Sequence, residues 1–169
     1  MKHRAPIVLA PYSTAWRLSF IAERSRLLDA LPSDFVVEHV GSTAIPGMPS
    51  KPMIDLMLGA PSLEEAQAVI PTLADLGYQY MPEHEQEIPD RRFFAFPSTR
   101  PRQFHLHAVK RNGAFWHKHI LFRDRLAAQR ELAQEYADLK RSLAARFHDD
   151  RAAYTETKTP FILQVLQRE

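Results

Sequence analysis

The order of the predicted elements indicates an α/β or α+β fold with a small mixed sheet flanked by helices. Two observations carry this prediction: residues 35–40 and 52–58 are apolar segments of strand length, and residues 92–96 and 103–110 form a second such pair. Helical segments precede and separate the strands, and the C-terminal region is helical. A chain of 169 residues is long enough for one domain and too short for two ordinary ones, so we expect 1–169 to be a single domain.

The first helix is predicted to follow Pro11-Tyr12-Ser13 and to end near Ala30, before the Leu-Pro-Ser-Asp sequence at 31–34. Apolar residues at roughly helical spacing are expected to form its buried face: Trp16, Phe20, Ile21, Leu27, Leu28 and Leu31.

A second helix is predicted after Ser62, which forms a capping box with Glu65, and it is expected to end near Gly77. Residues 78–81 then form a short strand, and the polar, proline-flanked segment 82–90 is predicted to be an exposed loop. The remaining helical segments are 114–128, 131–148 and a final piece that Thr159 and Pro160 could cap.

The composition excludes several classes of protein. The absence of cysteine excludes disulfides, thiol nucleophiles and cysteine-type zinc sites. No stretch reaches membrane-spanning length and no long apolar region follows the basic start, so we expect a cytoplasmic protein without membrane contact. The net charge is +2, with acidic and basic residues interspersed. This pattern is compatible with an anionic small molecule and does not support nucleic acid as a partner.

The residues with the clearest chemistry lie between Glu38 and Leu58. Gly41 and Ser42 follow the first strand, and Asp55 lies inside the otherwise apolar second strand. A glycine followed by a small hydroxyl residue lets the backbone bend tightly and offer N–H groups to an anion. An acid in an apolar strand is costly unless a cation pairs with it. We therefore predict a phosphate-binding turn that faces a metal-binding carboxylate.

This pattern resembles the signature of the DNA polymerase β-like nucleotidyltransferase superfamily. More narrowly, residues 37–47 and 51–55 look like the GrpB family, also called UPF0157, and the likeness runs from about Tyr12 to Leu166. Further matching segments are Phe104-His105-Leu106-His107-Ala108-Val109, Trp116, Leu121-Phe122-Arg123-Asp124, Glu135-Tyr136, Leu139-Lys140 and Tyr154-Thr155 with Lys158. The resemblance implies a nucleotidyltransferase fold with Asp55 as the catalytic acid. Some family members look to be fused to dephospho-coenzyme A kinase, which implies a role near nucleotide or coenzyme metabolism.

The sequence departs from the superfamily pattern at Met57, where a second carboxylate is usual. Two-metal transfer chemistry needs several anionic oxygens, so other ligands must replace that carboxylate. Glu38 is expected on the adjacent strand, and His105 and His107 share one face of their own strand, so all three could join Asp55 as metal ligands. The resemblance implies a divalent metal, Mg²⁺ or Mn²⁺, and the imidazoles make Zn²⁺ a third candidate. The alternative is that the histidines are partly exposed, hydrogen-bonded surface groups.

Three basic residues are candidate ligands for phosphate. Lys51 precedes the second strand, Arg92 begins the strand 92–96, and Lys158 matches a family position in the C-terminal region. Each has a structural alternative, as a solvated loop lysine, a surface arginine or a helix-surface ion pair. His117 and His119 are two residues apart on a helix, do not share a face and are a poor metal pair.

Three functions stay open on these observations. The first is metal-dependent transfer of a nucleotidyl or phosphoryl group from a nucleoside triphosphate to an unidentified acceptor. The second is a non-catalytic module that binds a nucleotide or another phosphate-bearing small molecule. In this case the transfer activity was lost together with the second carboxylate. The third is a metal-dependent hydrolase.

Overall fold

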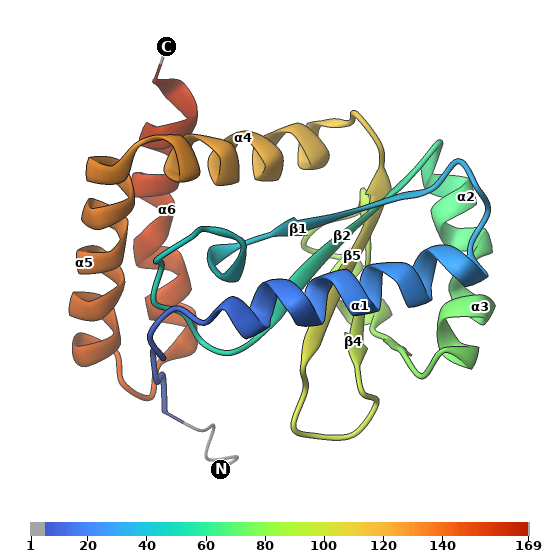
Figure 1. The fold of residues 1–169 in the computed structure, drawn as a ribbon, viewed down its shortest axis with the longest axis horizontal. Helices are drawn as coiled ribbons and strands as arrows, with labels where there is room; N and C mark the ends of the chain where they lie inside the picture. The colour runs from blue at the N-terminus through green and yellow to red at the C-terminus, as the bar shows by residue number, and fades with distance from the viewer. Residues whose placement is uncertain (1–5, 169) are drawn as a thin grey trace.

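The computed structural model describes residues 6–168, and its centre is a five-stranded mixed sheet (Figure 1). The strands are β1 (Val36–Val40), β2 (Ile54–Ala60), β3 (Gln79–Tyr80), β4 (Arg91–Phe96) and β5 (Phe104–Lys110). Their order in the sheet is β1-β2-β5-β4-β3, with β2 and β5 parallel and the other neighbours antiparallel. The predicted α+β class is confirmed.

Helices cover both faces of the sheet. Within residues 6–168 they are α1 (Thr14–Ala30), α2 (Leu63–Ala68), α3 (Ile70–Asp75), α4 (Ala114–Ala128), α5 (Arg130–Arg146), α6 (Arg151–Gln167) and the 3₁₀ helices η1 (Ser42–Ala44) and η2 (Pro82–Glu85). Helices α1, α2 and α3 form the main core with one face, whereas α4 packs on the other. Helices α5 and α6 lie side by side (Figure 1) and pack around the loop that follows β1. None of these helices is both long enough and apolar enough to span a membrane.

Alternation along β2 decides which face carries the candidate acid. Leu56 and Leu58 are fully buried in the main core, as predicted. Asp55 and Met57 point to the opposite face, where Met57 packs with Trp116 of α4. The side chain of Asp55 therefore lies on the α4 face of the sheet, at the end of β2 where the strand begins.

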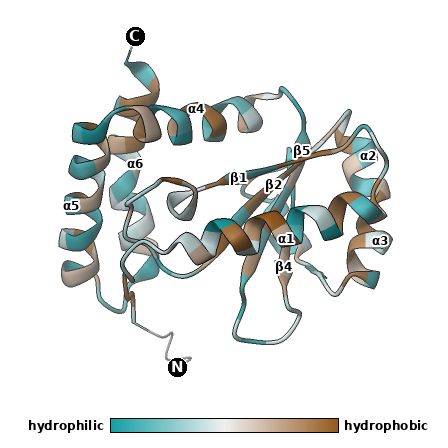
Figure 2. Ribbon diagram, viewed as in Figure 1, coloured by the Kyte–Doolittle hydropathy of each residue, from teal (hydrophilic) through white to brown (hydrophobic). Residues whose placement is uncertain are grey.

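The buried face of α1 differs from the prediction at one position. Ile21 is 50% exposed, and apolar residues appear as brown patches on the outward side of α1 in Figure 2. Glu23 is buried instead, at 7% exposure, and its Oε1 accepts hydrogen bonds from the Tyr78 hydroxyl at 2.8 Å and from Arg26 at 2.7 Å. Apolar spacing missed Glu23 because its burial depends on partners distant in sequence.

The helix predicted after Ser62 is two helices. The Ser62 hydroxyl accepts from the Glu65 N–H at 3.1 Å, which confirms the cap, and Gly77 has a φ of +94° at the end of the segment. Between them the helix breaks at Val69, which separates α2 from α3. Pro71 explains the break, because it has no N–H to donate to the carbonyl of Gln67 and its ring crowds that carbonyl, so it is tolerated only in the first turn of a new helix.

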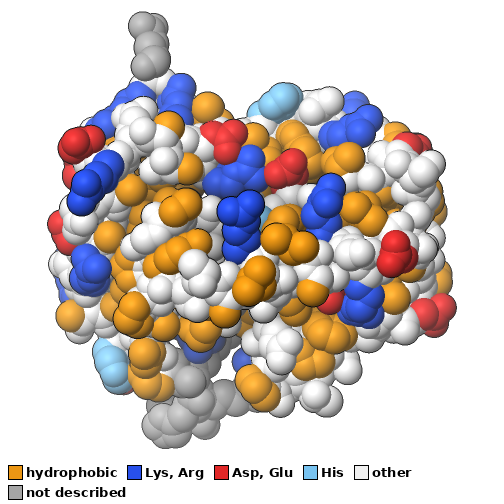
Figure 3. All heavy atoms as spheres, in the orientation of Figure 1, with side chains coloured by type: hydrophobic (Ala, Val, Ile, Leu, Met, Phe, Trp, Pro, Cys, Tyr) orange, Lys and Arg blue, Asp and Glu red, His pale blue; other side chains and the backbone are white. Residues whose placement is uncertain are grey.

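Two further segments differ from the sequence prediction. The segment 82–90 is not entirely loop, because it contains η2. In the C-terminal region, Pro160 lies inside α6, and the helix is capped by Asp150, whose carboxylate accepts from the Ala153 N–H at 3.0 Å. On the face that carries α1, basic side chains lie among acidic and apolar ones (Figure 3).

Candidate functional site

The turn after β1 brings Gly41 against Asp55. Gly41 has a φ of +75°, and a Cβ added there would lie 2.7 Å from the Asp55 Oδ2 atom. Only glycine therefore fits between β1 and the carboxylate. Behind the turn, His39 Nε2 and Thr43 Oγ1 lie 2.9 Å apart and tie η1 to β1. The predicted Gly41–Ser42 turn and Asp55 thus belong to one site.

Replacing Gly41 with alanine should destabilise the protein by about 3 kcal/mol, because it combines backbone strain with a clash against Asp55. Gly47→Ala is a matched control, since Gly47 has a φ of +77° and no atom within 4 Å of an added Cβ. The control should cost only about 1 kcal/mol, the strain alone. Urea unfolding of both variants measures the difference. Equal losses would show that Asp55 can move away from the turn.

Two histidines of β5 lie beside Asp55. The parallel register aligns Asp55 with His105 and Met57 with His107. The Asp55 Oδ1 atom is 3.2 Å from His107 Nε2 and 3.8 Å from His105 Nδ1. Burial acts to raise the pKa of Asp55, but the hydrogen bond from His107 and the adjacent imidazoles outweigh it, and the pKa lies below its ordinary value. Asp55 is therefore an ionised carboxylate at neutral pH.

Arg91 determines which ring nitrogen of His107 carries the proton. Its Nη1 atom lies 3.3 Å from His107 Nδ1. A guanidinium group can only donate, so Nδ1 accepts and the ring proton resides on Nε2, where it is donated to Asp55. The hydrogen bonds to Arg91 and to Asp55 thus occupy both ring nitrogens of His107. The structure thus brings His107 to Asp55 as predicted, but as a hydrogen-bond donor.

His119, which the sequence reasoning set aside, faces the same site. Its ring centroid is 6.4 Å from that of His107, and its Nδ1 lies 2.8 Å from the carbonyl oxygen of Phe115, to which it donates. Burial lowers the pKa of His105 and of His119 to about 4, so both rings are neutral at pH 7. His119 was missed because it was compared only with His117, and the packing of α4 on β5 has no local signal.

The side chains around Asp55 do not form a complete metal centre. Glu38 points to the same face, but its Oε2 accepts from Arg123 Nη1 at 2.7 Å. Met57 is fully buried and offers no oxygen. Across residues 6–168, no three His, Asp or Glu side chains are placed to hold one ion. The divalent metal implied by the resemblance therefore does not fit the donor set of this chain.

Three lysines come together near the start of β2, and we call Lys51, Lys140 and Lys158 the lysine cluster. Lys51 and Lys158 place Nζ atoms 5.7 Å and 4.2 Å from the ring centroid of Tyr154. Lys140 is 2% exposed, and its Nζ donates to the carbonyl of Pro49. The cluster joins the loop before β2 to α5 and α6. Lys140 was noted in the sequence only as a family match, because its burial depends on the packing of α5.

The lysine cluster makes no direct ion pair within residues 6–168. None of the three ammonium groups forms an ion pair with a carboxylate of residues 6–168. Burial, followed by mutual repulsion, lowers the pKa of Lys140 to about 7. Burial also lowers the pKa of Lys158 to about 8, and that of Lys51 falls for the same reason. The negative charge of Asp55 acts on Lys51 and Lys158, which ties the cluster to the acid.

Ser42 connects the turn to the C-terminal helices. A side-chain hydrogen bond joins it to Tyr136 of α5, a residue 4% exposed. The Lys140 ammonium lies 5.1 Å from the centroid of the Tyr136 ring. Tyr136 therefore links the Ser42 hydroxyl to the lysine cluster, and the phosphate-binding role of Ser42 stays a prediction.

Arg92 is not at this site. It pairs with Ala108 in the sheet and points to the face opposite Asp55, where its Nε donates to Gln67 at 2.6 Å and its Nη1 lies 3.4 Å from a Glu85 oxygen. This is a correction of its predicted place among the phosphate ligands.

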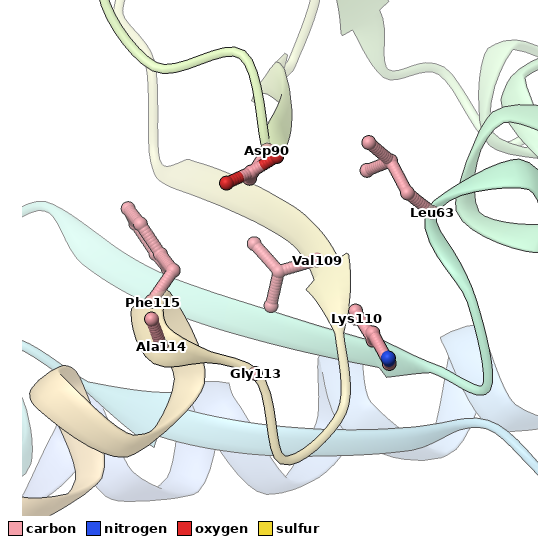
Figure 4. Close-up of a pocket in the computed structure, with 7 residues that line it drawn as sticks. All are labelled: Leu63, Asp90, Val109, Lys110, Gly113, Ala114 and Phe115. Atoms are coloured by element: carbon pink, nitrogen blue, oxygen red, sulfur yellow. The ribbon is translucent and has the colours of Figure 1, made fainter.

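A cavity of about 250 Å³ lies near the C-terminal end of β5 (Figure 4). It is lined by Leu63, Asp90, Val109, Lys110, Gly113, Ala114 and Phe115. Neither Asp55 nor any member of the lysine cluster lines it, so this cavity is separate from the candidate site.

Comparison with known proteins decides the family. A model described as the GrpB protein matches residues 6–168. The chain belongs to the GrpB family. A UPF0157 protein of Pseudomonas aeruginosa is 36% identical over 166 residues, covering 96% of this chain and 67% of that protein. A UPF0157 protein of Streptomyces coelicolor is 31% identical over 162 residues, covering 96% of this chain and 83% of that one.

A solved GrpB structure has the same fold. The crystal structure of the conserved protein GrpB from Enterococcus faecalis superposes with a TM-score of 0.83 at 28% identity, covering 94% of both chains. A dephospho-CoA kinase of Mycolicibacterium paratuberculosis is 28% identical over 201 residues, which cover 98% of this GrpB chain and 46% of the kinase. The family predicted from the Gly41–Asp55 region is confirmed.

Proposed function

We propose that this GrpB protein binds a nucleotide, or another phosphate-bearing small molecule, at the lysine cluster. The observation that supports the proposal is a group of three lysines, Lys140 buried and Lys51 and Lys158 half-buried, that form no ion pair with a carboxylate of residues 6–168. Burying a charge is costly unless an opposite charge joins it. A polyphosphate supplies that charge, and its oxygens accept charge-assisted hydrogen bonds from lysine.

The neighbouring residues suit such a ligand. Ser42 contributes a hydroxyl beside Tyr136, and the Tyr154 ring lies near both Lys51 and Lys158. The kinase name of one relative is consistent with a nucleotide or coenzyme ligand, as is the resemblance to nucleotidyltransferases. Because the lysines come from three separate segments, the binding site is complete only when α5 and α6 pack beside the sheet.

Replacing Lys158 with methionine should weaken ATP binding at least about tenfold, since one charge-assisted contact contributes roughly 1.5–3 kcal/mol. Isothermal titration of ATP and GTP into the purified protein measures the effect. Lys110→Met removes the same charge from an exposed position at the far end of β5 and should leave the affinity unchanged. Equal losses in the two variants would point to non-specific attraction, and no binding to the wild type would refute the proposal.

A second candidate function is nucleotidyl transfer, and the ionised state of Asp55 favours it. The Asp55 side chain is 31% exposed and lies beside the lysine cluster, where a carboxylate can accept the proton of an acceptor hydroxyl. The acceptor oxygen would then bond to the α-phosphorus as the bond to pyrophosphate breaks. Pyrophosphate release from ATP by the wild type, lost in Asp55→Asn, would support transfer; equal release by both would count against it.

A further inference from the structure

We infer that the lysine cluster binds its phosphates without a divalent cation, and that Asp55 is held as a hydrogen-bonded anion and not as a metal ligand. The inference rests on the proposed function and concerns the same site. It differs from the expectation for the nucleotidyltransferase superfamily, in which metal ions and paired carboxylates handle the phosphates. Three features of the site lead to it.

The first feature is the state of the Asp55 carboxylate. Oδ1 accepts the Nε2 proton of His107 at 3.2 Å, and Oδ2 lies against Gly41. The His107 proton cannot simply move to Nδ1, because the guanidinium of Arg91 donates there. A metal ion at Oδ1 would have to displace a donor whose orientation is already fixed.

The packing of Arg91 reinforces this arrangement. Its side chain is 9% exposed, and its Cζ lies 4.9 Å from the ring centroid of Phe93 and 5.8 Å from that of Phe115. A guanidinium packed between two rings gains cation–π attraction, and moving it away would lose those contacts. Arg91 is therefore a positioning residue that acts on Asp55 through His107.

The second feature is the lack of further oxygen ligands on this face. Met57 is fully buried at the position of the usual second carboxylate. Glu38 is held by Arg123, whose Nη1 donates both to Glu38 at 2.7 Å and to the carbonyl of His39 at 2.9 Å. Mg²⁺ at a nucleotide site is usually held by one or two carboxylates together with phosphate oxygens and waters. Asp55 would have to serve as that carboxylate alone, and its Oδ1 already accepts the proton of His107.

The third feature is the positive charge already present. In two-metal sites the cations neutralise the phosphates. Here three ammonium groups are available for that task. The negative charge of Asp55 acts to raise the pKa of Lys51 and of Lys158. A divalent cation near Asp55 would be repelled by these lysines, and Mg²⁺ on the nucleotide would occupy the oxygens that the lysines bind.

The inference predicts that divalent metal weakens ATP binding, whereas a metal-dependent nucleotidyltransferase needs the metal to bind ATP. ATP should bind in excess EDTA, and excess MgCl₂ should weaken binding by about threefold or more. Asp55→Asn should bind ATP in EDTA at least as tightly as the wild type, because a negative charge near the phosphates is removed. Binding that requires Mg²⁺ or Mn²⁺ and disappears in Asp55→Asn would overturn this inference and leave the proposed function standing. No binding under any condition would overturn both.

A second measurement needs no variant. Mn²⁺ alone, titrated into the ¹⁵N-labelled wild type, broadens the signals of any imidazole beside its binding site. We expect the ring signals of His105 and His107 to stay sharp, with the His107 nitrogen shifts showing a proton on Nε2 and an accepting Nδ1. Selective broadening of both rings, or a His107 proton on Nδ1, would overturn the inference.

Discussion

Lys140→Met should give a protein that is more stable and binds phosphate poorly. The ammonium of Lys140 is 2% exposed and has no carboxylate partner in residues 6–168, and burial lowers its pKa to about 7. A group whose pKa is lower in the folded state reduces stability at every pH below its unfolded value, here the ordinary 10.5. Methionine has a similar length and carries no charge, so the penalty disappears.

The gain in stability should be about 2 kcal/mol at pH 7, after the loss of the hydrogen bond to the Pro49 carbonyl. Binding of ATP should weaken at least about tenfold in the same variant. Urea unfolding and titration calorimetry on one preparation measure both effects, with Lys110→Met as the control for charge. A less stable Lys140→Met would show that the contact with Pro49 outweighs the buried charge. Unchanged affinity would remove Lys140 from the binding site.

This exchange of stability for binding is typical of functional sites. A core position is ordinarily filled by an apolar residue, and replacing buried ionic groups by apolar ones is often stabilising. Lys140 sits in such a position, next to Tyr136 and against the Pro49 carbonyl of the loop before β2. The unfavourable charge is explained if a ligand neutralises it. That is the physical reason for placing the binding site at the cluster and not in the cavity beside Phe115.

The part of the site that could be predicted from sequence is the part that depends on strand alternation. Asp55, His105 and His107 were expected on common faces of their strands, and the parallel register of β2 and β5 brings them together. The same rule explains the error at Arg92. Neighbouring residues of a strand lie on opposite faces, and the sheet pairing places Arg91 on the face of Asp55 and Arg92 on the other. The sequence offers two adjacent arginines and does not determine which of them faces the site.

The residues that sequence reasoning missed depend on helix packing. His119 reaches His107 because α4 crosses the sheet, and Lys140 is buried because α5 packs on the loop after β1. Glu38 is diverted from Asp55 by Arg123, a residue far along the chain. Helical periodicity predicts that these helices exist, but it does not determine which side chains meet across them.

The protein should lose stability as the pH falls from about 6.5 to about 4. Burial lowers the pKa of His39, His105 and His119 from 6.5 to about 4, so the unfolded chain binds protons that the folded chain excludes. Stability rises with pH wherever the unfolded state binds more protons, so it is highest above 6.5 and falls through this window. His39 alone should account for about 3 kcal/mol, because it is 8% exposed and stacked on Phe20.

Urea unfolding at several pH values between 7 and 4 measures this loss. His39→Gln should flatten the dependence, since an amide does not titrate here. His148→Gln is the control, because the His148 side chain is 62% exposed, and the dependence should stay as in the wild type. An equal slope in both variants would show that His39 is protonated without unfolding. Asp55 adds a loss of its own only at lower pH, since its pKa lies below the ordinary value of 3.8. A fall in stability that begins well above pH 4 is therefore a property of the histidines that surround the candidate site and its supporting turn.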